Sequence, residues 1–470
     1  MGHGTRYLLL LALGVGLSGC AHFQARPLSP KRQLTAFEAR SLADPGLRTF
    51  LAANGSPEPA PGQPWGLESL TLAAFYLQPT LAEQREALLA VEAGVRTAAE
   101  RPNPTLSVAV GNDAGVPGAF SPWSIPLGLD WPIETAGRRS YRIAEVRDRA
   151  LAARWQLIGG LWQVRARLRS ALLALYAARQ TEAVLAREAT ARERVLELLQ
   201  GQFTAGAVSS FEVTQARIAR DGLVLAQQQA AGQELEARVA VAGALGLTVD
   251  QISGIPLSFS AFQQFPQQLT GPGVRRQALL GRADLRAALA DYAATQAALQ
   301  LQIALQYPQI HLGPGYTWNA QLAGDSQWVL GVSLTLPLLN HNQGPIAEAQ
   351  AARALAAAHF DSIQSAAITQ IDSALAAYRA PLERLGTVQG LSIDLRRRLA
   401  SVQAQVQAGE LQPLDLANAQ VAFEVGTQQQ LQAQLDAQSA LGQLEQAMQS
   451  SLTLPARAIA AAQNTPAPSP

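Results

Sequence analysis

Residues 138–247 constrain the fold more than any other stretch, because they lack proline and repeat apolar residues at helical spacing. No proline occurs between Pro132 and Pro256, and apolar residues recur three or four positions apart from Ile143 to Leu175. This pattern predicts long helices packed as a coiled-coil-like pair. A single helix from Arg138 to Gln200 would extend roughly 95 Å at about 1.5 Å per residue, far longer than a compact domain.

The two helices of this pair need a connecting turn. Gly201 and Gly206 supply it in our interpretation. Ser209, with Glu212 three residues later, has the spacing of a capping box and predicts the start of the returning helix.

The first residues have the pattern of a processing signal. Arg6 precedes an apolar core from Leu8 to Leu17, which is too short to span a bilayer, and Leu17-Ser18-Gly19-Cys20 closes the segment. This tetrad resembles a bacterial lipobox, whose cysteine is lipidated once residues 1–19 are removed. An ordinary cleaved signal is the alternative. Ala21 after Cys20 favours an anchor in the outer membrane. Because Cys20 is the only cysteine, a disulfide or thiolate metal site within one protomer is excluded.

Residues 20–66 are predicted to form the lipid anchor and an extended linker, since Pro57, Pro59, Pro61 and Pro64 punctuate their second half. No later run approaches the roughly 18 apolar residues of a membrane helix, so strands must make any membrane crossing. The formal net charge of +1 is too small to create an overall positive potential that would attract nucleic acid.

Two segments of period two follow a helix predicted over residues 67–100, which Pro79 interrupts. In the second segment, alternate residues from Trp123 to Trp131 are apolar, and those between them are mostly small or polar. Pro126 argues against a central strand. Together the segments predict a strand hairpin at residues 105–133.

The same succession of elements then recurs. Gly206 and Gly409, in the two predicted turns, are 203 positions apart, and Pro132 and Pro337, at the two strand ends, are 205 apart. This agreement predicts an internal duplication. The first predicted repeat covers residues 67–255 and contains the helical hairpin at 138–247. A connection at 256–273 leads to the second repeat at 274–454, with a helix at 274–306, a strand hairpin at 309–338 and a helical hairpin at 343–452 that is kinked at Pro381. A tail at 455–470 follows.

Tryptophan marks the ends of the predicted strands. Trp123 and Trp131 lie eight residues apart, roughly 26 Å along a strand. This is comparable with the ~25 Å apolar band and aromatic girdles of an outer-membrane barrel. Trp318 and Trp328 lie at ends of the second pair of strands, so the four tryptophans are candidate girdle residues. A soluble β-sandwich is the alternative.

Four strands cannot close into a barrel, and lipid does not tolerate open sheet edges. The chain must therefore oligomerise if its strands cross a membrane. Two copies would leave an interior filled by side chains, whereas three would leave a usable lumen.

The combination of features resembles the TolC family of outer-membrane efflux channels. The lipobox with Cys20, the duplicated unit, Arg101-Pro102-Asn103-Pro104, the stretch from Trp131 to Arg139 and the paired Ala-Gly turns carry the resemblance. It implies a mainly α fold with transmembrane β-strands. In such a homotrimer, four strands per protomer build a twelve-stranded barrel in outer-membrane lipid, continuous with a long periplasmic α-helical barrel.

The resemblance also implies partners, namely a periplasmic adaptor protein and an inner-membrane pump, driven by protons in our interpretation. The stretch from Pro132 to Arg139 is similar to the metal-resistance branch, whose channels serve cobalt, zinc, cadmium or copper exporters. We therefore expect a passive exit duct that favours heavy-metal cations over drugs. The alternatives are the exit channel of a type I protein secretion system and a non-conducting structural lipoprotein of the envelope.

Residue roles follow from these placements. Arg138, Arg139 and Arg142 are expected to face lipid headgroups or neighbouring protomers. Glu212 and Asp415 could form carboxylate rings near the tunnel mouth, or only cap helix starts. The residues expected at the adaptor-contacting hairpin tips are Gly206, Ala207, Val208, Gly409, Glu410 and Leu411.

The sequence contains no recognisable set of metal ligands, and its histidines are scattered. His311 falls on the predicted lumen face, where a lone imidazole is more often a polar lining residue than a ligand. No glycine-rich phosphate loop and no nucleophile paired with a base are apparent. We expect no cofactor and no enzymatic activity.

Overall fold

The computed structural model describes residues 22–56, 59–60, 62–112, 123–266, 272–319 and 327–450. The chain divides into two units, Met1–Arg40 with Pro470, and Ser41–Ser469. In the first unit, the described residues contain one helix, α2 (Pro30–Glu38). The predicted signal peptide, Cys20 and the C-terminal tail lie outside the described residues.

The prediction of an extended linker over residues 20–66 is wrong in part, because α2 and α3 (Pro45–Ala53) lie within it. Each helix has its proline at the first turn, where the missing N–H costs no hydrogen bond. Asp44 caps α3 by accepting a hydrogen bond from the Leu47 amide at 2.9 Å. Leu47 and Leu51 of α3 are fully buried and belong to the largest core cluster of the chain.

The first repeat contains three shorter helices and two long ones. α4 (Leu67–Leu77) and α5 (Pro79–Ala99) are separated at Gln78, which confirms the predicted interruption at Pro79. α6 (Arg138–Thr204) and α7 (Ser210–Leu245) form the long pair, and α8 (Val249–Ile252) follows. The predicted role of Gly201 in the turn is wrong, because Gly201 lies inside α6; Gly206 alone takes a positive φ there, at 76°.

The second repeat departs from prediction in its first and last helices. A 3₁₀ turn, η1 (Ser260–Phe262), lies in the connection. The helix predicted over 274–306 is two helices, α9 (Pro272–Gly281) and α10 (Ala283–Ala304), because the chain is extended at Arg282. α11 (Gln343–Gln407) continues through Pro381, and α12 (Pro413–Met448) ends a few residues before the predicted position.

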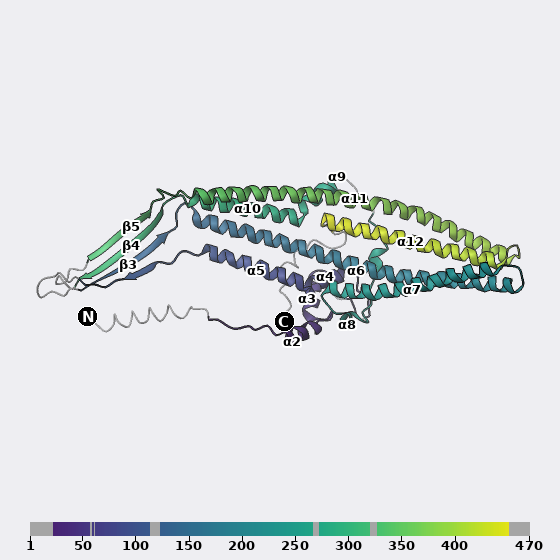
Figure 1. Cartoon of the computed structure of the whole chain (residues 1–470). Helices are drawn as coiled ribbons and strands as arrows, with labels where there is room; N and C mark the ends of the chain where they lie inside the picture. Colours follow the sequence, from purple (N-terminus) through teal and green to yellow (C-terminus); the bar gives the residue numbers. More distant parts are fainter. Residues whose placement is uncertain are drawn as a thin grey trace. The chain divides into compact units, whose positions relative to one another are not determined.

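The long helices lie side by side, with α6 at the centre (Figure 1). Toward the sheet, α6 packs against α5 and α10, and α11 packs against α10. Toward the hairpin turns, α6 packs against α7 and α12, and α11 against α12. α5 therefore continues the line of α7 along α6, and α10 continues the line of α12.

The strands form one antiparallel sheet. β1 (Thr105–Val108) and β2 (Gly111–Asn112) both pair with β3 (Trp123–Ile133), which pairs with β4 (Gln309–Asn319), and β4 pairs with β5 (Gln327–Thr335). The predicted first strand is thus interrupted after Val108. Pairing of β3 with β4 joins the two repeats, with Ile125 opposite Trp318 and Trp131 opposite Leu312.

The hydrophobic core lies away from this sheet. Its largest fully buried side chains come from α3, α4, α5, α6 and the connection, and include Phe75, Leu161 and Phe262. No described strand residue is buried. Among the described residues, no helix is both long enough and apolar enough to cross a membrane.

Candidate functional site

The sheet has one apolar face that no other part of the described chain covers. Residues paired directly across antiparallel strands share a face, and the register pairs apolar with apolar side chains: Leu127 with Tyr316, Trp131 with Leu312, Ile133 with Ile310, Tyr316 with Trp328, and Leu312 with Val332. On β5, Trp328 is 79% and Leu330 70% exposed. A soluble protein rarely leaves an apolar surface of this extent open.

The four predicted girdle tryptophans all lie on this sheet with their rings partly open. Trp123, Trp131 and Trp318 are 44–49% exposed. The Trp328 ring contacts that of Tyr316, with centroids 4.8 Å apart. Aromatic rings with one polar edge suit the boundary between an apolar and an aqueous phase.

The opposite face carries mainly small and polar residues. Gly128 pairs with Gly315, and Gly313 with Gly331. On this face His311 Nδ1 lies 3.0 Å from both carboxylate oxygens of Asp130. The sequence placed His311 and Asp130 on this face; the structure adds the contact between them. The sheet ends in solvent-open edges, since β1 and β5 have no outer partner among the described residues.

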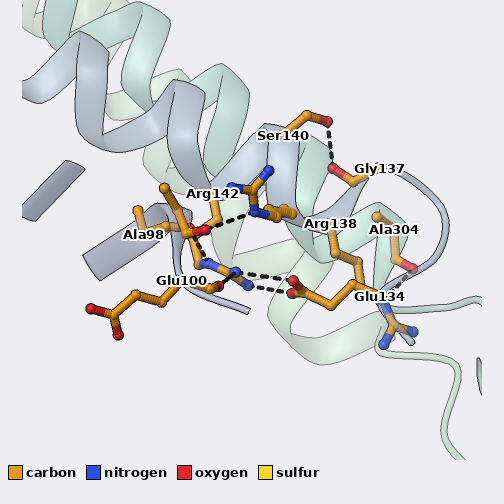
Figure 2. A network of polar contacts seen from close by, with 10 residues as sticks. Ala98, Glu100, Glu134, Gly137, Arg138, Ser140, Arg142 and Ala304 are labelled. Atoms are coloured by element: carbon orange, nitrogen blue, oxygen red, sulfur yellow. Dashed lines mark hydrogen bonds and ion pairs between the residues drawn. The ribbon is translucent and has the colours of Figure 1, made fainter. Parts of the chain in front are cut away.

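Arginines tie this sheet to the helices (Figure 2). Arg142 donates through Nη1 and Nη2 to the Glu134 carboxylate at 2.6 and 3.2 Å, and through Nε to the Ala98 carbonyl at 2.8 Å. Arg142 also donates to the Glu100 carbonyl at 3.0 Å. The last carbonyls of a helix have no partner within it, so Arg142 caps the end of α5.

The other two arginines of this stretch act similarly. Arg139 donates through Nε to the Ala99 carbonyl at 2.8 Å. The buried Arg138 donates to the carbonyls of Ala304 and Tyr307, at the end of α10. The prediction that these arginines face headgroups or other protomers is therefore wrong for Arg138 and Arg142, whose guanidinium groups bind within the chain.

A second junction lies at the middle of the long helices, where one polar side chain in each repeat caps the returning helix. Gln78 donates through Nε2 to the carbonyls of Gly243 and Ala244 at 3.1 and 3.0 Å. Arg282, 204 positions later, donates through Nη1 to the Ala447 carbonyl. Sequence reasoning missed Arg282, although the repeat offset from Gln78 points to it.

Buried charges also join the two repeats near this junction. Arg165 and Arg169 of α6 contact the Glu445 carboxylate of α12 at 2.9 and 3.3 Å, and Arg169 donates to both the carbonyl and the side-chain oxygen of Gln438. Burial lowers the pKa of Arg169, against the attraction of Glu445. These arginines were not identified as buried from the sequence. The available signal was their spacing of four residues, which places both on one side of the helix next to its apolar residues.

The two hairpin tips have the same geometry. Gly206 and Gly409 have φ values of 76° and 78°. At the first tip the amides of Gly206 and Ala207 donate to the carbonyls of Phe203 and Gln202. At the second, the amides of Gly409 and Glu410 donate to those of Val406 and Gln405. Both turns are therefore Schellman-type helix ends, in which glycine avoids the strain of a positive φ.

The tip side chains are open to solvent. Ala207 and Glu410 are exposed, and Val208 and Leu411 are half-buried. Glu212 accepts a hydrogen bond from the Ser209 amide at 3.0 Å, and Asp415 accepts one from the Gln412 amide at 2.9 Å. Both carboxylates thus cap the returning helices, as the capping-box spacing predicted for Glu212.

No group of three or more His, Cys, Asp or Glu side chains is arranged to hold a metal ion within the part of the chain that the structure describes.

Residues 74–247 and 274–449 match the family model for outer membrane efflux proteins, in two segments that together cover more than half of the chain. The chain belongs to the outer membrane efflux protein family. This membership confirms the predicted family resemblance, and the proteins of this family are channels rather than enzymes.

Two curated relatives are similar over part of the chain. The pyoverdine export outer membrane protein OpmQ of Pseudomonas aeruginosa is 30% identical over 159 residues, which cover 32% of each protein. The cobalt-zinc-cadmium resistance protein CzcC of Cupriavidus metallidurans is 25% identical over 254 residues, which cover 54% of this chain and 58% of CzcC. The chain therefore spans only about a third to three fifths of these relatives' lengths.

Solved structures share the fold over most of the chain. CusC matches with a TM-score of 0.64 and 16% identity, covering 82% of this chain and 92% of CusC. The outer membrane protein VceC of Vibrio cholerae matches with a TM-score of 0.64 and 18% identity, covering 82% of this chain and 96% of VceC. The mainly helical fold with a small antiparallel sheet is therefore that of TolC-like channels, as predicted.

Proposed function

We propose that the chain forms the outer-membrane exit duct of a tripartite efflux system. An inner-membrane pump and a periplasmic adaptor deliver the substrate, and the duct passes it outward without doing chemistry. The observation that carries this proposal is the sheet, whose apolar face is exposed on β3 at Trp123, Leu127 and Trp131 and along the whole of β5. Lipid is the environment in which such a face costs least.

The unpaired edges support a closed oligomer. Backbone N–H and C=O groups cannot remain unpaired in lipid, so β1 of one protomer pairs with β5 of the next. Three protomers supply twelve strands and enclose a lumen. The glycine-rich face, with the Asp130–His311 pair, then lines this lumen, and the tunnel of long helices continues it into the periplasm.

The hairpin tips are the proposed contacts with the adaptor. They present exposed turns built around Gly206 and Gly409. Glu212 and Asp415 lie within a turn of these tips and place a carboxyl group there while they cap their helices. Repeated in each protomer, these carboxylates attract cations to the tunnel mouth.

Heavy-metal cations are the favoured cargo. The similarity to CzcC and the carboxylates near the tips support this choice. The similarity to OpmQ supports a second candidate, export of an organic metal chelator such as the pyoverdine in that protein's name. Drug efflux, type I protein secretion and a purely structural envelope role are the remaining alternatives.

Cys20 is proposed to carry the lipid anchor, which would hold the N-terminus at the outer membrane. Labelling cells with a radioactive fatty acid tests this proposal: wild type should incorporate label and a Cys20→Ala variant should not. Equal labelling would reject the anchor without affecting the channel assignment.

The cargo is tested by growth of a deletion strain across graded zinc, cobalt, cadmium and copper, an iron-limited medium and several hydrophobic drugs, with complementation by the intact gene. Sensitivity confined to metals supports cation export. A defect confined to secretion of an iron chelator supports the second candidate. Sensitivity to drugs alone would reject both.

A further inference from the structure

A cavity of about 500 Å³ opens where the apolar face of the sheet meets the helices. One wall is apolar and comes from the strands: Trp131 and Ile133 of β3, and Leu312 of β4. Two arginines also line the cavity, Arg101 in the segment before β1 and Arg139 at the start of α6. An apolar wall together with two arginines is a surface for an amphipathic anion.

The two arginines are available to a ligand. Arg139 donates through Nε to the Ala99 carbonyl, and this bond holds its side chain in place. The Nη1 and Nη2 groups of its guanidinium have no partner among the described residues. Arg101 is exposed and makes no hydrogen bond or ion pair with the described part of the chain. Neither group is needed to neutralise a carboxylate of the fold.

The one acidic side chain lining the cavity is already compensated. Glu134 accepts two hydrogen bonds from Arg142, at 2.6 and 3.2 Å, and this pair faces the end of α5. The cavity therefore keeps an excess of positive charge from Arg101 and Arg139. Guanidinium forks bind phosphate oxygens through paired, charge-assisted hydrogen bonds.

We propose that this cavity binds the headgroup phosphate of a glycerophospholipid in the membrane leaflet next to the periplasm. Arg101 and Arg139 bind the phosphate, and Trp131, Ile133 and Leu312 contact the first carbons of the acyl chains. The inference rests on the proposed function, because it requires the apolar face to lie in the bilayer. The apolar wall, continuous with that face, favours a lipid over free phosphate, and basic pockets at this depth suit lipid headgroups.

Native mass spectrometry of the intact protein tests the site. Phosphatidylglycerol, phosphatidylethanolamine and diacylglycerol with the same acyl chains are titrated separately, and inorganic phosphate is added as a competitor. Wild type should bind both phospholipids in preference to diacylglycerol, and inorganic phosphate should not displace them. Arg101→Gln should bind the phospholipids about tenfold more weakly, the effect of losing roughly one charge-assisted contact, and Arg101→Gln with Arg139→Gln weaker still.

Arg276→Gln is the matched control, because Arg276 is an exposed arginine of α9 without a partner among the described residues. Its lipid binding should equal that of wild type. Equal binding by Arg101→Gln and wild type would overturn the proposal, as would displacement of lipid by inorganic phosphate, which would indicate a site for a soluble anion. Fractionation separates this failure from failure of the proposed function: if the wild-type protein is absent from outer membranes, the channel proposal itself fails.

Discussion

Arg165 and Glu445 form an ion pair with 2.9 Å between Nη1 and Oε2, although only 4% and 5% of their side chains are exposed. Arg165 lies in α6 of the first repeat and Glu445 near the end of α12 in the second. Arg169 contacts the same carboxylate. This buried cluster links the two repeats near the end of α12. Beyond that end, α10 takes the place of α12 beside α6.

Removing one partner of this cluster should be costly. Glu445→Gln leaves the guanidinium groups of Arg165 and Arg169 buried without their counter-charge, and breaking a buried pair in this way typically costs about 3–5 kcal/mol. We expect a markedly lower thermal unfolding midpoint of the purified protein. Glu197→Gln is the control, because its pair with Arg194 is more than half exposed and should contribute less than about 1 kcal/mol. Equal midpoints for the two variants would contradict the role of the cluster.

Acid should weaken the contact of α6 with α7. Burial tends to raise the pKa of Glu234, but hydrogen bonds and charge from Arg238 and Arg179 outweigh it, so the pKa lies below its ordinary value. A carboxyl with a depressed pKa stabilises the fold above its unfolded pKa of about 4.3, and this contribution disappears as pH falls through the folded pKa. Glu234→Gln should therefore unfold at a lower temperature than wild type at pH 7.

This difference between wild type and Glu234→Gln should shrink steadily below about pH 4. Glu236→Gln serves as control, since Glu236 is exposed on the same helix and makes no bond among the described residues. It should unfold like wild type across the range. If the unfolding temperatures of wild type and Glu234→Gln differ by the same amount at acid pH as at pH 7, the negative charge of Glu234 is not the source of the stabilisation.

The junction of sheet and helix should depend on Arg142. Arg142→Gln removes the paired hydrogen bonds to Glu134 and leaves the carbonyls of Ala98 and Glu100 without their donor. Losing such bonds costs about 1–3 kcal/mol each where the groups stay buried. We expect faster amide hydrogen exchange over residues 95–104. Arg147→Gln, an exposed change on the same helix, should leave exchange there unchanged; equal exchange in both variants would refute the capping role.

Substitutions at the tip glycines Gly206 and Gly409 should leave the fold intact but abolish export. Asp can adopt a positive φ more readily than most residues, and a Cβ at Gly206 or Gly409 meets no atom within 4 Å. Gly206→Asp and Gly409→Asp should therefore reach the membrane in normal amounts yet lose export in the complementation assay. Gly254→Asp is the matched control, because Gly254 has a φ of 79°, equal open space and a position away from the tips. Normal export from both tip variants would remove the tips from the adaptor interface.

Features set by neighbours in sequence were predicted correctly. The capping box of Ser209 and Glu212 and the glycine turn at Gly206 depend on residues within one helical turn, and the structure contains both. The alternation that assigned the strands depends only on the pleat. Pro79 revealed the break before α5, because proline cannot sit inside a helix without losing a backbone bond.

Features set by distant contacts were missed. The break at Arg282 has no proline to mark it, and it forms where the guanidinium finds the end of α12. Arg138 was assigned to the protein surface, since nothing in its local sequence indicates that the end of α10 lies beside it. Arg165 and Arg169 were not recognised as buried because their partners lie some 270–280 positions away.

The most direct test of the channel assignment uses two adjacent residues of β5, Val332 on the apolar face and Ser333 on the opposite face. Each is replaced by cysteine in a Cys20→Ala background, spin-labelled, and reconstituted in phospholipid vesicles. Collision rates with oxygen, which concentrates in lipid, and with a water-soluble nickel chelate are then measured. We expect the label at 332 to favour oxygen and that at 333 to favour nickel. Preference for nickel at both positions would contradict a sheet embedded in the membrane.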